Sequence, residues 1–111
     1  MFKVTHAFAE KTFNQLNTQM FDGLLDMSAI TLEVEALDTE WGYCLDEDDG
    51  EIYLGITDEF PTLQLFETVM AHEMIHLFQI DAGWKVGHDH VFEGFATWAR
   101  NNLNLDVQAV H

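Results

Sequence analysis

The segment TVMAHEMIHLFQIDAGWKVGHDHVFEGFATWA, from Thr68 to Ala99, contains four of the six histidines in the chain. Two of these, His72 and His76, enclose Glu73 in the pattern His-Glu-x-x-His. In a helix, four residues advance the chain by about 400°, so both imidazoles project from one face and can share one metal ion. Glu73 then lies beside the metal without pointing straight at it, which suits a base acting on a metal-bound water.

The chemistry that this pattern predicts is hydrolysis assisted by Zn²⁺. Zinc lowers the pKa of a bound water from ~16 to ~7. Glu73 would take the proton of this water as it attacks a carbonyl, and would pass the proton to the departing amine. Two histidines and a glutamate would be costly to bury unpaired in so apolar a segment, which favours a bound metal over packed core side chains.

A third protein ligand is needed, because a catalytic zinc normally has three plus a water. The candidates that follow the motif are His88, His90 and Glu93. Gly83 and Gly87 allow the chain to reverse after the helix, and Gly87 gives the backbone before His88 the freedom to close on the metal. His90 could instead contact the substrate or the developing oxyanion.

The elements before the motif can be predicted from apolar spacing and turn residues. Apolar residues at helical spacing predict a helix from about Val4 to Phe21, and Asp22-Gly23 supplies a stop. AITLEVEAL (residues 29–37) alternates apolar and polar side chains, which predicts a half-buried strand. TEWGYCL (39–45) and EIYLGIT (51–57) follow as two further strands, and Asp49-Gly50 between them favours a tight hairpin turn.

The motif itself lies in a largely buried helix that we predict from Thr62 to about Asp81, ended by Gly83. A last helix is predicted from about Asp89 to Asn102. The sequence therefore predicts a single α+β domain over residues 1–111, with an N-terminal helix, a three-stranded antiparallel sheet, the buried motif helix and a C-terminal helix. An exposed strand at the sheet edge would let an extended peptide bind as an added strand.

The net charge limits the classes of partner. Twenty acidic residues against four basic ones give a formal net charge of −16 at pH 7. Such a surface repels phosphates, whose binding depends on Lys and Arg displacing counterions, so we expect no autonomous nucleic-acid binding. The charge also suggests a second function, an acidic binding or decoy protein with a structural zinc that occupies a basic DNA-binding partner. A third is a zinc hydrolase of a non-peptide substrate.

The compartment is predicted from what the chain lacks. Cys44 is the only cysteine, so an internal disulfide and a four-cysteine zinc ribbon are both excluded. No stretch approaches the ~18 apolar residues of a membrane span, and MFKVTHAFAEKTF lacks the basic-then-apolar pattern of a secretory signal. We therefore expect a cytoplasmic protein with no membrane partner.

Taken in order, the motifs resemble those of the SprT-like zinc metalloproteases, the family that includes the Spartan proteases acting on DNA–protein crosslinks. The resemblance rests on FNQLNTQMFDGLL, WGYC, EIYLGI, VMAHEMIHLFQ and GHDHVF, and it extends from about Phe13 to Val107. It implies a zincin-like fold and an endopeptidase acting on a protein or peptide substrate. It also implies that His72, His76 and His88 bind zinc and that Glu73 is the catalytic base.

Glu93 is the main rival of His88 as third ligand. FEGFATWA is similar to the Asn-Glu-Gly-Phe-Ala stretch of thermolysin-like aminopeptidases, in which a glutamate of the following helix completes the zinc site. The chain from His76 to Glu93 is about two residues shorter than in that group, which would turn a helical side chain by ~200°. The N-terminal and strand motifs match the SprT-like pattern instead, so His88 is the predicted ligand, with Glu93 and His90 as alternatives.

Overall fold

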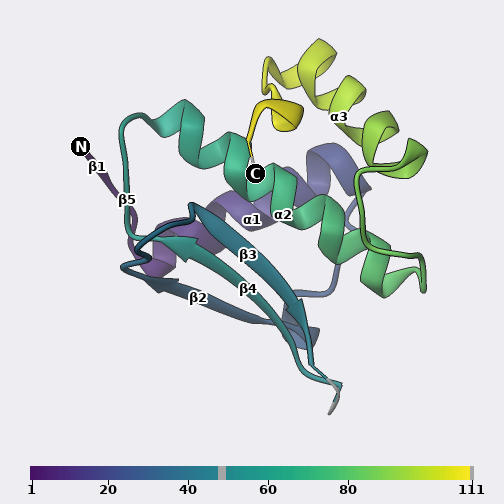
Figure 1. The fold of residues 1–111 in the computed structure, drawn as a ribbon, viewed down its shortest axis with the longest axis horizontal. Helices are drawn as coiled ribbons and strands as arrows, with labels where there is room; N and C mark the ends of the chain where they lie inside the picture. Colours follow the sequence, from purple (N-terminus) through teal and green to yellow (C-terminus); the bar gives the residue numbers. More distant parts are fainter. Residues whose placement is uncertain (48–49, 111) are drawn as a thin grey trace.

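The computed structural model describes residues 1–47 and 50–110 and is shown in Figure 1. Along the chain the elements are β1 (Phe2–Lys3), α1 (His6–Phe21), a 3₁₀ turn (Met27–Ala29), β2 (Thr31–Glu35), β3 (Gly42–Asp46), β4 (Ile52–Thr57), β5 (Glu59–Phe60), α2 (Leu63–Asp81), α3 (His90–Leu103) and a second 3₁₀ turn (Val107–Ala109). Asp49, predicted to form a tight turn with Gly50, lies outside the described residues. The α+β class predicted from the sequence is confirmed.

The main sheet is mixed, with the strand order β2-β4-β3. β3 and β4 form the expected antiparallel hairpin, whereas β2 pairs with β4 in parallel, with Leu32 opposite Leu54. The prediction of an antiparallel three-stranded sheet is therefore wrong. Apolar alternation determines which face of a strand is buried, but it does not determine which strand becomes the neighbour. The connection of residues 36–41 is long enough to cross two strand spacings of about 4.8 Å, which leaves the central position to β4.

Helices α1 and α2 cover the same face of this sheet. Figure 1 shows α2 crossing the molecule between the sheet and α3, with α1 beside it. The inward side chains Leu32, Leu54 and Ile56 are buried beneath the helices. Because α2 has neighbours on both sides, every residue from Thr68 to Leu77 is buried. The motif helix is thus largely buried, as the sequence predicts.

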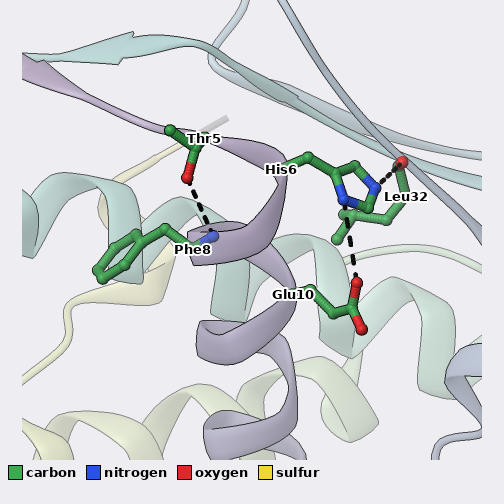
Figure 2. Close-up of polar contacts among 5 residues, drawn as sticks. All are labelled: Thr5, His6, Phe8, Glu10 and Leu32. Atoms are coloured by element: carbon green, nitrogen blue, oxygen red, sulfur yellow. Dashed lines mark hydrogen bonds and ion pairs between the residues drawn. The ribbon is translucent and has the colours of Figure 1, made fainter.

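Side-chain caps explain where the helices begin. The Thr5 hydroxyl accepts a hydrogen bond from the Phe8 N–H at 3.1 Å, so α1 begins at His6 (Figure 2). Val4, which we expect inside the helix, instead donates its N–H to the Asp58 carbonyl at 2.8 Å. This contact continues the short β1–β5 pairing, whose two-residue strands are too brief to give a periodic pattern. Caps also shift the starts of α2 and α3 by one residue from those predicted.

The two edges of the main sheet have different surroundings. β2 lies at one edge, and the Nε2 atom of His6 in α1 lies 3.0 Å from the carbonyl oxygen of Leu32 (Figure 2). The Nδ1 atom of the same ring lies 3.9 Å from a carboxylate oxygen of Glu10, one turn further along the helix. The contact with Leu32 joins α1 to β2. The opposite edge is β3, which packs beside α2.

Gly55 is expected to tolerate no side chain. A Cβ atom at this position would overlap the ring of Tyr43, whose hydroxyl donates a 2.9 Å hydrogen bond to Glu33. Gly55→Ala must therefore displace the ring and break this bond, and we expect it to lower the free energy of unfolding by about 1–3 kcal/mol in urea titrations. Gly94→Ala is the control, because it adds a methyl group in open space on α3 and should be stabilising. Unchanged stability of Gly55→Ala would show that the ring moves aside without cost.

Among the residues that the structure describes, no helix combines the length and the apolar character required to cross a bilayer.

Candidate metal centre

Three histidine side chains converge beside the middle of α2. The rings of His72 and His76 lie one turn apart, with centroids separated by 4.9 Å. The ring of His88, which comes from the loop before α3, lies 5.2 Å from each of them. One ligand atom from each ring lies within 4.8 Å of the other two, which is close enough for a shared metal ion. The three predicted ligands are therefore brought together, although the geometry does not identify the metal.

Packing from α3 supports this cluster. Phe92, in the first turn of α3 and only 1% exposed, lies with its ring centroid 5.0 Å from His72, 5.2 Å from His76 and 4.6 Å from His88. A single aromatic ring thus contacts all three imidazoles and limits their rotation. His72 and His76 are buried, whereas His88 is exposed, so the cluster is open to solvent on the side of His88.

The two rival ligands do not belong to the cluster. Among the described residues, the group close enough to share one ion consists of the three histidines, without Glu93 or His90. Glu93 is near, since it lines a pocket of about 150 Å³ together with His72, His88, Phe92 and Gln108. The ring of His90 packs against Trp84 at 5.8 Å, at the start of α3. Glu93 is therefore adjacent to the centre, whereas His90 turns toward a different contact.

A backbone carbonyl from the end of the chain fixes the ring of His72. Its Nδ1 atom lies 3.0 Å from the carbonyl oxygen of Val107, which is fully buried. A carbonyl oxygen can only accept, so Nδ1 must carry the proton. The neutral ring then has its lone pair on Nε2, the form in which histidine binds a metal. This contact could not be predicted, because a backbone carbonyl leaves no trace in the residue pattern.

Gln79 fixes the ring of His76 in the same manner. The Nδ1 atom of His76 lies 2.9 Å from Oε1 of Gln79, which also accepts from the N–H of Gly87 at 3.3 Å. Burial lowers the pKa of His76, the hydrogen bond to Gln79 opposes this effect, and the nearby His88 lowers the pKa further. The ring is therefore held neutral, as ligation requires. The sequence analysis missed Gln79, whose spacing of three residues from His76 was the available indication.

Glu73 is buried on the side of α2 that faces the sheet. It is 6% exposed, and burial together with the negative charge of Glu40 raises the pKa of its carboxyl to about 7. Its charge acts in turn on Cys44 of β3, whose thiol pKa is raised to about 12 mainly by burial. Glu73 therefore acts electrostatically on the edge strand β3, and it adjoins His72 in α2 without belonging to the histidine group.

The raised pKa of Glu73 predicts a pH dependence of stability in the metal-free protein. The unfolded chain releases this proton near pH 4.5 and the folded chain near pH 7. The folded state therefore loses stability as the pH rises between these values, by on the order of 3 kcal/mol. Glu73→Gln removes this contribution. When unfolding is measured in the presence of a chelator, the free energy of unfolding of Glu73→Gln relative to that of the wild type should therefore increase from pH 4.5 to pH 7.5. A constant difference across that interval would contradict the pKa assignment.

The site can thus be described by the chemistry of its side chains. Three imidazoles could hold a metal ion, and a buried carboxyl lies next to them on the same helix. In comparisons with protein-family models, with curated proteins and with solved structures, the chain matches none of them.

Proposed function

We propose that this protein is a zinc-dependent endopeptidase of SprT-like type. His72, His76 and His88 would bind the zinc, and Glu73 would be the general base. The observation that carries the proposal is the convergence of three histidines next to a buried glutamate of the same helix. Each of these residues has a separate role in hydrolysis by a zinc peptidase.

The donor set fits zinc. Hydrogen bonds at Nδ1 give His72 and His76 the tautomer with the lone pair on Nε2. Three histidine ligands with one side open to solvent correspond to a catalytic zinc, since a structural site is closed by four protein ligands. The exposure of His88 provides that open side.

The chain supplies the proton transfers. When bound, zinc acts as a Lewis acid that polarises a carbonyl and lowers the pKa of water to ~7. Glu73 accepts the proton of the attacking water and then delivers it to the departing amide nitrogen. Because the Glu73 carboxyl is buried, exchange of this proton with bulk solvent is limited, which favours transfer of the proton to the leaving group.

The position of β3 supports a peptide substrate. β3 is the edge strand of the main sheet on the side of α2, and the charge of Glu73 acts on Cys44 of this strand. An extended peptide paired with this edge would form main-chain hydrogen bonds and would pass beside Glu73.

The test is metal analysis of the purified protein combined with cleavage of an unfolded protein substrate. We expect one zinc per chain, loss of cleavage after treatment with a chelator, and recovery when zinc is restored. Bound zinc without any cleavage would contradict the proposal. A stable complex with a basic DNA-binding protein in that case would favour the decoy function, which the charge of −16 permits.

A further inference from the structure

Gln79 is an unusual residue for its position. It lies near the end of α2 and is completely buried, in a helix whose other buried side chains are mostly apolar. A buried amide is costly unless all its polar atoms are hydrogen-bonded. An apolar side chain of the same length would avoid that cost, so the contacts of the amide need an explanation.

The amide of Gln79 pairs with a single backbone residue, Gly87. Its Nε2 donates to the Gly87 carbonyl at 2.9 Å, and its Oε1 accepts from the Gly87 N–H at 3.3 Å. The Gly87 N–H can only donate and the Gly87 carbonyl can only accept, so this pair determines which way round the amide lies. Oε1 is thereby directed to accept from Nδ1 of His76 as well.

Gln79 also holds the loop at a second point. Its backbone carbonyl accepts a 2.7 Å hydrogen bond from the N–H of Trp84, and the Trp84 indole donates to the Asp89 carboxylate at 3.1 Å. Nε2 of Gln79 lies 3.4 Å from the other oxygen of Asp89. The loop from α2 to α3 is therefore fastened to Gln79 on both sides of His88.

From these contacts we propose that Gln79 is the positioning residue of the metal centre. The side chain of Gln79 fixes the tautomer of His76 in α2. It also fixes the path of the backbone at Gly87, the residue immediately before His88. A buried glutamine thus joins two ligands that reach the centre from different elements. The inference depends on the proposed zinc site, but it does not depend on peptidase activity.

The test uses two substitutions of Gln79 and one control. Gln79→Met keeps the length and removes all polar contacts, and Gln79→Glu keeps an acceptor for His76 and for the Gly87 N–H. Gln64→Met is the control, because Gln64 is an exposed glutamine of the same helix whose side chain bonds only the Asn104 carbonyl among the contacts described. Cooperative unfolding of each variant checks that it is folded.

The first readout is the zinc dissociation constant from competition with a chromophoric chelator. We expect Gln79→Met to bind zinc about 10–100-fold more weakly than the wild type, as is typical when an outer-shell partner is removed. Gln64→Met should bind as the wild type does. Wild-type affinity in a folded Gln79→Met protein would overturn the inference.

The second readout is the protonated nitrogen of His76, measured by ¹⁵N NMR of the imidazoles in metal-free protein at about pH 8. The proton should lie on Nδ1 in the wild type, should lose that preference in Gln79→Met and should regain it in Gln79→Glu. A proton on Nε2 of His76 in the wild type would refute the inference even if no variant folded. If the wild type binds zinc but cleaves nothing, the peptidase proposal fails and the role of Gln79 stands.

Discussion

Glu73→Gln is expected to abolish hydrolysis while leaving one zinc per chain. The substitution keeps the size of the side chain but removes its ability to take a proton, and loss of a general base typically costs ~10²–10⁴ in rate. The metal should remain, because Glu73 lies beside the three histidines without being part of their group. Turnover of an unfolded protein and zinc content should be measured on the same preparation.

Glu67→Gln is the matched control for this experiment. It makes the same chemical change on the same helix, at a half-buried position outside the histidine cluster. Its turnover and zinc content should equal those of the wild type. Loss of zinc from Glu73→Gln, or turnover unchanged by it, would refute the assignment of Glu73 as the base.

His88→Ala is expected to weaken zinc binding by several orders of magnitude. It removes one of the three proposed ligands, and since His88 is exposed the fold should tolerate the change. The dissociation constant should be measured by competition with a chelator of known affinity. The thermal unfolding temperature of the metal-free variant should stay near that of the metal-free wild type, which separates loss of a ligand from loss of the fold.

His90→Ala and Glu93→Ala are the controls for the third ligand. Both residues are exposed and lie close to His88, but neither belongs to the group that can share an ion. Both variants should therefore retain zinc. Tight zinc binding by His88→Ala, combined with its loss from Glu93→Ala, would transfer the third position to Glu93, which lines the same small pocket.

Local signals in the sequence predicted the elements well and the neighbours of the strands poorly. The helix boundaries predicted from apolar spacing came within two residues of those observed, and the side-chain caps Thr5, Thr62 and Asp89 account for the differences at the helix starts. The parallel pairing of β2 with β4 was not predictable in this way. It depends on which strand occupies the centre of the sheet, and that is decided by packing beneath α1 and α2.

The same distinction applies to the metal centre. His72 and His76 could be assigned to one face from helical spacing alone, whereas His88 depended on how a loop returns to the helix. The contacts at Nδ1 of the two helix histidines were not predicted, although the spacing of Gln79 from His76 gave an indication of one of them. One involves the carbonyl of Val107, distant in the chain, and the other depends on Gln79 meeting the backbone at Gly87.

If the proposed zinc site is occupied, the bond between His72 and Val107 makes the turn Val107–Ala109 a partner in metal binding. Docking of the Val107–Ala109 turn on α2 orients one proposed ligand, so we expect docking and zinc affinity to be thermodynamically coupled. Coupling of this kind is reciprocal: whatever free energy docking adds to zinc binding, zinc must add to docking. Zinc binding should therefore slow amide hydrogen exchange in the Val107–Ala109 turn. This turn would then report on the metal although none of its residues is a ligand.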